Sequence, residues 1–120
     1  VFLGPRADVP AVLRASAAGV LSSAFEGLPM SLLEYGMAGL ATVATDAGET
    51  GEVLGHGHAG ILVPRRDAAA LAEGLVALLR SSELRARLGE ELRRRVGARY
   101  GAVAVVPRLC GIYDAVLSGA

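Results

Sequence analysis

Two carboxylates eight positions apart, Glu26 and Glu34, stand on either side of a short turn that leads into an apolar segment. Pro29 suits the first position of a helix, because its missing N–H group would have had no intrahelical partner there. Leu28, which precedes it, has no side-chain oxygen that could cap the helix. We therefore expect the first N–H groups of this helix to be free for an outside anion, and the helix polarity favours a phosphate there.

The two carboxylates bracket this predicted anion site. Carboxylates accept hydrogen bonds from hydroxyl groups, so a ligand with hydroxyls on both sides of a diphosphate would satisfy all three features. A nucleotide-sugar is such a ligand. Glu26 also admits a second interpretation, a favourable interaction with the helix dipole from just outside the N-terminus, worth at most about 1 kcal/mol. Both interpretations can hold at once.

Length and composition favour one packed unit. The chain has 120 residues, of which 52% are hydrophobic, which argues for a globular core and against disorder. No apolar stretch is expected to span a bilayer. The 12 basic and 12 acidic residues cancel, so there is no global attraction to nucleic acid. Cys110 is the only cysteine, so no internal disulfide can form, and a reducing cytosol is the expected setting.

Hydrophobic patterning predicts alternating strands and helices. Short apolar runs predict strands at 1–3, 19–22, 41–44 and 60–63. Periodicity and capping residues predict helices over 9–17, from 29 to about 38, around 52–54, and over 67–79, 81–96 and 103–117. The expected caps are Asp8, Asp67, and Ser81 or Ser82. The apolar positions expected on one helix face are Leu71, Leu75, Leu78 and Leu79 in the fourth helix and Leu84, Leu88, Leu92 and Val96 in the fifth. This alternation predicts parallel βαβ units and hence an α/β fold. About four strands are expected, fewer than a complete doubly wound half needs.

An ordered series of motifs extends from the first glutamate towards the end of the chain. It includes the runs 22–29, 32–34 and 38–46, followed by Gly48, Glu52, Gly57, residues 60–64, residues 67–79, residues 84–89 and Tyr113. The series resembles the donor-binding region of retaining GT-B glycosyltransferases, and it matches best the large family-four group with its Glu-x7-Glu signature. A Glu-x7-Glu pair alone recurs by chance, whereas the ordered set is specific. The resemblance covers nearly all of the chain.

This resemblance implies a Rossmann-like α/β fold, with a parallel sheet flanked by helices and followed by C-terminal helices. Residues 1–120 would form a single partial domain, the later portion of the nucleotide-sugar-binding C-terminal domain. The first elements of that domain and the whole N-terminal acceptor domain would lie outside the chain.

The resemblance also implies roles for individual residues. Glu34 would accept hydrogen bonds from both ribose hydroxyls of the nucleotide. Glu26, the predicted catalytic residue, would contact hydroxyls of the transferred sugar. Backbone contacts to sugar and phosphate would come from Gly27, Leu28, Pro29, Met30 and Ser31. The Arg and Lys that usually hold the diphosphate in this family would lie upstream.

These roles predict a retaining glycosyltransferase of the hexosyltransferase type. It would transfer a sugar from a nucleotide-diphosphate-sugar, which is a substrate rather than a cofactor. The acceptor hydroxyl would belong to a sugar, a lipid-linked sugar or a small molecule, in polysaccharide or glycolipid biosynthesis. A cytoplasmic location is expected, compatible with peripheral contact to a membrane. The chain by itself is expected to be inactive, because it carries only part of the donor site.

No metal is expected. The resemblance implies a metal-independent enzyme, and His56 and His58 lie close in sequence but lack a third ligand nearby. The Arg-rich stretch 85–99 is interleaved with glutamates, which favours a solvated amphipathic helix over a nucleic-acid-binding face. Weak contact of that face with anionic lipid headgroups stays open.

Other polar residues are expected to have structural roles. Ser22 and Ser23 follow a strand, where serine is most often a turn former. Glu49 stands where the family usually has glycine, and an added carboxylate near a phosphate should point outward. Cys110 is expected to be a small core residue.

Two other functions stay open. A non-catalytic module could bind nucleotide or pair with a partner chain, because an incomplete sheet leaves a strand edge and apolar helix faces exposed. A GT-B relative, such as a sugar-nucleotide epimerase or a glycogen synthase, would share the architecture, although the pattern around Glu26 fits family-four enzymes better.

Overall fold

The computed structural model describes residues 1–119, and it alternates helices with short strands as the sequence predicts. In chain order the elements are α1 (Val9–Ala15), β1 (Gly19–Leu21), α2 (Met30–Met37), β2 (Thr42–Thr45), α3 (Thr50–Val53), β3 (Ile61–Val63), α4 (Ala68–Arg80), α5 (Ser82–Tyr100) and α6 (Ala102–Leu117). Local capping sets two of the helix starts. Asp67 accepts a hydrogen bond from the N–H of Ala70 at 2.9 Å, and Ser81 accepts one from the N–H of Leu84 at 3.1 Å.

The three strands form one parallel sheet in the order β1-β2-β3. Gly19 is opposite Thr42, and Val43 is opposite Ile61. Because parallel strands end at the same edge, the loops that follow them, residues 22–29, 46–49 and 64–67, emerge together. This carboxyl edge is where open α/β sheets bind their ligands.

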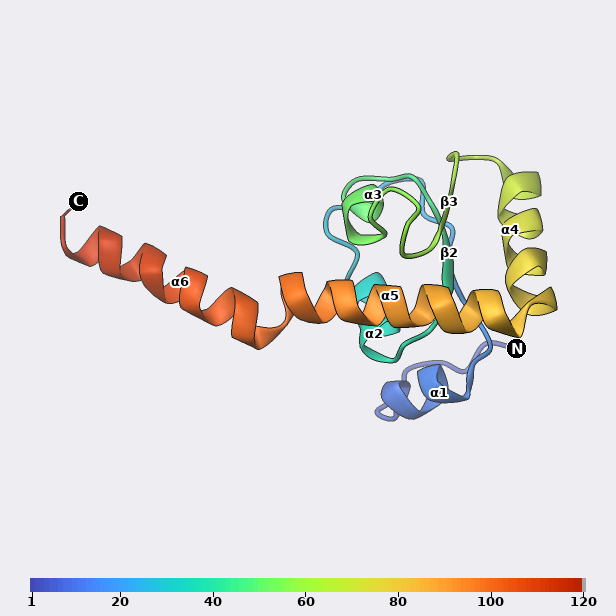
Figure 1. The fold of residues 1–120 in the computed structure, drawn as a ribbon, viewed down its shortest axis with the longest axis horizontal. Helices are drawn as coiled ribbons and strands as arrows, with labels where there is room; N and C mark the ends of the chain where they lie inside the picture. The colour runs from blue at the N-terminus through green and yellow to red at the C-terminus, as the bar shows by residue number, and fades with distance from the viewer. Residues whose placement is uncertain (120) are drawn as a thin grey trace.

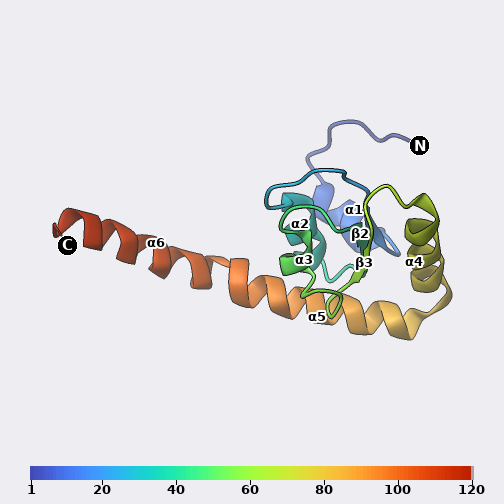
Figure 2. The ribbon, with the colours of Figure 1, turned by 90° about the horizontal axis from the view of Figure 1, so that it is seen from above.

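Helices cover both faces of the sheet, with α2 and α3 on one side of the strands and α4 on the other (Figure 2). Successive side chains of β2 point to opposite faces of the sheet, so Ala44 packs towards α2 and α3 while Val43 packs towards α4. Helix α5 contributes buried side chains to the hydrophobic clusters on both faces of the sheet. Leu92 and Val96 are buried in the first cluster, and Leu88 is buried in the second. Burying each such side chain stabilises the fold by roughly 1.5–3 kcal/mol.

Small residues allow α2 and α5 to pack closely. A Cβ atom at Gly36 would lie 2.5 Å from Cγ2 of Val96, and a Cβ atom at Gly89 would lie 2.2 Å from the carbonyl oxygen of Gly39. Both distances are too short for real atoms, so this contact requires glycine at both positions. It fixes the orientation of α2, which carries Glu34.

Helix α6 follows α5 after an extended residue, Gly101, and projects away from the rest of the chain (Figure 1). Pro107 lies inside this helix without ending it. The helical run Ser82–Leu117 is long and apolar enough, by length and composition alone, to cross a membrane, a criterion that core helices and signal sequences also meet. The sequence was expected to contain no such stretch, an expectation that overlooked the apolar composition of α6, in which Arg108 and Asp114 are the only charged residues.

Several local expectations were also wrong. Residues 1–3 form no strand; β1 pairs only with β2, and Phe2 is fully exposed. Cys110 is exposed rather than in the core, because nothing within residues 1–119 packs over its part of α6. Leu79, expected on the buried face of α4, is 53% exposed. The carboxylate of Asp8 pairs with Arg6 instead of capping α1.

Candidate functional site

The loop between β1 and α2 is tied to the carboxyl edge of the sheet by β2. The hydroxyl of Thr45, the last residue of β2, donates a hydrogen bond to the carbonyl of Ser23 at 2.5 Å. It also lies 3.4 Å from the carbonyl of Leu21. Thr45 itself is buried, so the anchor is held by packing on both sides. The start of the loop is thereby fixed three residues before Glu26.

Glu26 is half-buried and held in place by Ser23. The Ser23 hydroxyl donates a hydrogen bond to Oε1 of Glu26 at 2.5 Å. A carboxylate can accept several hydrogen bonds, so this contact orients the side chain and leaves Oε2 available to a ligand hydroxyl. The sequence pattern favoured a turn-forming role for Ser23, and this contact with Glu26 was not anticipated. The spacing of three residues between a serine and a glutamate in one loop was the signal that could have indicated this contact.

Gly48 brings a second loop against the backbone of Glu26. Its φ is +53°, a conformation that glycine adopts without the Cβ penalty of other residues. A Cβ atom there would lie 1.9 Å from the carbonyl oxygen of Glu26. The N–H of the next residue, Glu49, donates a hydrogen bond to the carbonyl of Gly27 at 3.1 Å. Glu49 is exposed, as expected for a carboxylate that stands where the family usually has glycine.

The N-terminus of α2 has no side-chain cap, as the sequence predicts. Pro29 is the N-cap rather than the first helical residue, so the helix begins one position later than expected, at Met30. The N–H of Leu32 bonds to the carbonyl of Pro29 at 3.0 Å. The N–H groups of Met30 and Ser31 precede the first intrahelical hydrogen bond, directly after the loop that carries Glu26. These two groups are the ones open to an anion.

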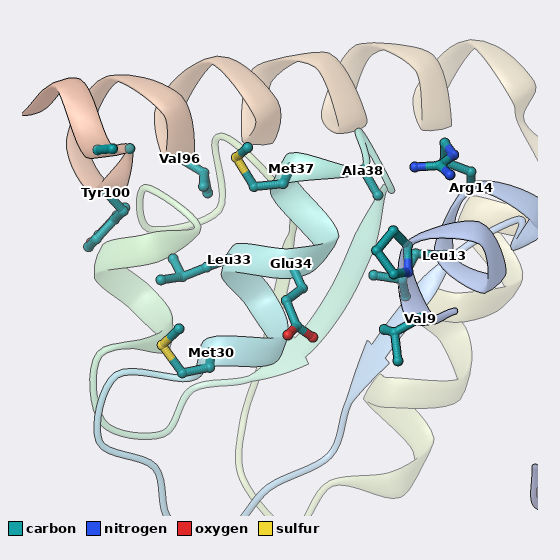
Figure 3. Close-up of a pocket in the computed structure, with 13 residues that line it drawn as sticks. Val9, Leu13, Arg14, Met30, Leu33, Glu34, Met37, Ala38, Val96 and Tyr100 are labelled. Carbon is teal, nitrogen blue, oxygen red and sulfur yellow. The ribbon is translucent and has the colours of Figure 1, made fainter. Parts of the chain in front are cut away.

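Glu34 lies in the second turn of α2 and lines a cleft of about 580 Å³ (Figure 3). Its carboxylate points away from α5, and its neighbours in the cleft are mostly apolar. They come from three places: α1 (Val9, Pro10, Leu13, Arg14), α2 (Met30, Leu33, Met37, Ala38), and the end of α5 with the start of α6 (Val96, Tyr100, Gly101, Ala102). An exposed carboxylate on an apolar wall suits a ligand with a flat apolar part and adjacent hydroxyls.

Tyr35, next to Glu34, anchors this part of α2 to the sheet. Its ring lies against Gly19, where a Cβ atom would come within 2.7 Å of it, and its hydroxyl donates to the carbonyl of Val20 at 3.5 Å. Burial, and to a smaller extent the charge of Glu34, raises the pKa of the Tyr35 phenol. The phenol therefore stays neutral around Glu34 at physiological pH.

The structure separates the two glutamates that the sequence paired. Glu34 lines the cleft, whereas Glu26 lies at the sheet edge with Ser23 and Gly48. Met30, at the start of α2, lies between them in the sequence and also lines the cleft. No group of three or more His, Cys, Asp or Glu side chains within residues 1–119 is placed to hold a metal ion. His56 instead contacts Glu52 at 3.3 Å.

The parallel sheet between helical layers, with an uncapped helix start after its first strand, defines a nucleotide-binding type of α/β fold. A sequence profile of the family described as glycosyl transferases group 1 matches residues 1–95. The chain therefore belongs to this family.

Solved structures show the same fold. The chain superposes with a TM-score of 0.89 on HepE of Anabaena, crystallised in complex with UDP, at 23% identity over 95% of this chain and 32% of that one. It superposes with a TM-score of 0.85 on sucrose-phosphate synthase of Thermosynechococcus elongatus, at 24% identity over 91% of this chain and 27% of that one. These likenesses confirm the GT-B fold.

The similar curated proteins include a synthase and several sugar transferases. The chain is 31% identical over 117 residues to N-acetyl-alpha-D-glucosaminyl L-malate synthase of Bacillus anthracis. This match covers 98% of this chain and 31% of the relative. It is 39% identical over 94 residues to phosphatidyl-myo-inositol mannosyltransferase of Mycobacterium leprae, 76% of this chain and 24% of the relative. The chain thus spans about a third or less of these proteins.

Proposed function

We propose that this chain contributes part of the donor site of a retaining glycosyltransferase, which transfers a sugar from a nucleotide-diphosphate-sugar to an acceptor hydroxyl. The observation that carries the proposal is the uncapped N-terminus of α2, with Glu26 fixed by Ser23 on one side and Glu34 in the cleft on the other. One structural neighbour, HepE, has been crystallised in complex with UDP, which supports a nucleotide ligand for a protein of this fold.

Each part of the ligand has a matching feature in the proposal. Glu34 accepts the ribose hydroxyls, and the apolar cleft takes the base. The N–H groups of Met30 and Ser31 contact the diphosphate. Glu26 accepts hydroxyls of the transferred sugar through the oxygen that Ser23 leaves open. As the glycosidic bond breaks, negative charge grows on the departing diphosphate, and the fixed dipoles of the α2 N-terminus stabilise it.

The family resemblance supports a metal-independent reaction in which an upstream Arg and Lys share the diphosphate charge. It also supports a cytoplasmic enzyme in which a further domain contributes to acceptor binding. One of these relatives has a lipid, phosphatidyl-myo-inositol, in its name, so a lipid-linked acceptor is one candidate for this protein.

Substitution of Glu34 tests the proposal. Losing hydrogen bonds between a carboxylate and two hydroxyls removes about 1.5–3 kcal/mol of binding, which is roughly 10- to 100-fold in affinity. We expect Glu34→Ala in the full-length polypeptide to weaken UDP binding by that factor in calorimetry and to reduce sugar transfer. Glu73→Ala, an exposed glutamate on α4, is the matched control and should bind UDP normally. Equal UDP affinity in the two variants would refute the proposal.

A further inference from the structure

A second hollow lies at the carboxyl edge of the sheet, apart from the cleft of Glu34. It has a volume of about 500 Å³ and is lined by Ala24 and Phe25 from the β1–α2 loop and by Arg65 and Arg66 from the β3–α4 loop. The two loops stand at the same end of the strands in both views (Figures 1 and 2). The hollow shares no residue with the first cleft, and its lining includes Phe25, the neighbour of Glu26.

The hollow is cationic and contains no carboxylate of its own. Within residues 1–119, neither Arg65 nor Arg66 forms a salt bridge, whereas Arg93, Arg94 and Arg99 do. Of the carboxylates in the neighbouring loop positions, that of Asp67 caps α4 by accepting a hydrogen bond from the N–H of Ala70. Two adjacent guanidinium groups with no acidic partner attract an anion, and their planar donors match phosphate.

The backbone at Arg66 has an uncommon conformation. Its φ is +61°, in the left-handed region, which costs a residue other than glycine about 1 kcal/mol or more. Strained positions of this kind are frequent at ligand sites. Opposite the arginines, Phe25 is 78% exposed although it is a large apolar residue on a short loop. An exposed ring beside two guanidinium groups offers a surface for the apolar or sugar part of a ligand that carries the anion.

We propose that Arg65, Arg66 and Phe25 form a subsite for the phosphate group of a phosphorylated acceptor. The assignment rests on the proposed function, because it uses Glu26 to mark the sugar end of the donor. The donor diphosphate has its own site at the N-terminus of α2. An anion held beside Phe25 therefore lies next to the sugar to be transferred, where an acceptor must approach. A water-soluble sugar phosphate and a lipid phosphate share this chemistry.

The test uses the ¹⁵N-labelled chain and glycerol 3-phosphate as the soluble probe. We expect amide chemical-shift changes centred on residues 24–26, on Arg65 and on Arg66. The double variant Arg65→Ala/Arg66→Ala should bind the probe at least about tenfold more weakly, because charge-assisted hydrogen bonds are lost. The control variant Arg87→Ala removes an exposed arginine from α5 and should bind normally. Saturating UDP should leave probe binding in place, since the two sites are separate.

A parallel arm distinguishes the two sources of phosphate. Vesicles of phosphatidylcholine with and without phosphatidic acid report the lipid form, and loss of phosphatidic-acid-dependent binding in the double variant supports the subsite as well. Unchanged binding of both probes in the double variant would overturn it. Displacement of glycerol 3-phosphate by UDP would also overturn it, because the hollow would then belong to the donor. If Glu34→Ala binds UDP normally while the double variant loses the probe, the proposed function fails and the acceptor role fails with it, but the anion site stands.

Discussion

The contact between Gly48 and the backbone of Glu26 yields a quantitative prediction for Gly48→Ala. An alanine Cβ would lie 1.9 Å from the carbonyl oxygen of Glu26, closer than any two such atoms can approach. One of the two loops must therefore move by about 1 Å or more. The alanine must also hold a φ of +53°. The substitution thus disturbs the position of Glu26 without changing any side chain in the site.

The cost has two parts. A left-handed φ costs alanine roughly 1–2 kcal/mol. Separating the loops weakens the hydrogen bond from the N–H of Glu49 to the carbonyl of Gly27, which contributes about 1 kcal/mol. We expect a loss of about 2–3 kcal/mol in the free energy of unfolding. Because a displacement of about 1 Å in a catalytic site can reduce the rate about 100-fold, sugar transfer should fall by roughly that factor.

Gly57→Ala is the matched control. Gly57 also has a positive φ, +98°, but a Cβ atom there would meet nothing within 4 Å. This variant carries the backbone strain without the clash. Urea unfolding of both variants, together with transfer rates in the full-length polypeptide, separates the two effects. If Gly48→Ala matches Gly57→Ala in stability and retains wild-type transfer, the proposed coupling between the loops and Glu26 is refuted.

Two further predictions concern α5. Gly89→Ala should lower the free energy of unfolding by about 2 kcal/mol in urea titrations, because its Cβ would lie 2.2 Å from a backbone carbonyl. Gly97→Ala, in the same helix but in open space, should instead stabilise by up to about 1 kcal/mol, and similar values for both would contradict the close packing. A hydrogen bond from His56, followed by one from Arg99, lowers the pKa of Glu52 in the folded protein. Ionised Glu52 therefore stabilises the fold above the pKa that it has in the unfolded chain, and this stabilisation is lost as the pH falls through its pKa in the folded protein. Thermal unfolding between about pH 5 and pH 3 should therefore show a steeper decline for the wild type than for Glu52→Gln, and parallel curves would contradict this role.

Local sequence patterns were sufficient to predict the elements of the fold. The β-branched and apolar runs gave the three strands of the sheet to within one residue at each end. Asp67 and Ser81 marked helix starts by their side-chain oxygens, and the spacing of Leu88, Leu92 and Val96 marked the buried face of α5. These signals are readable because they depend on neighbours one to four positions apart in the chain.

Contacts between distant segments were not predictable in the same way. The tripeptide 1–3 is apolar enough for a strand, but it has no strand in residues 1–119 to pair with. Cys110 has the pattern of a core residue, yet α6 extends beyond the packed layers. The hollow between Phe25 and the two arginines joins loops 40 positions apart. Such pairings depend on the orientation of whole elements.

By itself, the sequence determined the α/β alternation, the family and the uncapped start of α2 between two glutamates. Each of these depends on residue types at short, fixed spacings. Only the tertiary structure decided that Ser23 and Gly48 hold Glu26, that Glu34 faces a separate cleft, and that Arg65 and Arg66 lie beside Phe25. The reason is geometric: a parallel sheet gathers the loops after its strands at one edge, and the one-dimensional pattern does not contain the distances between those loops.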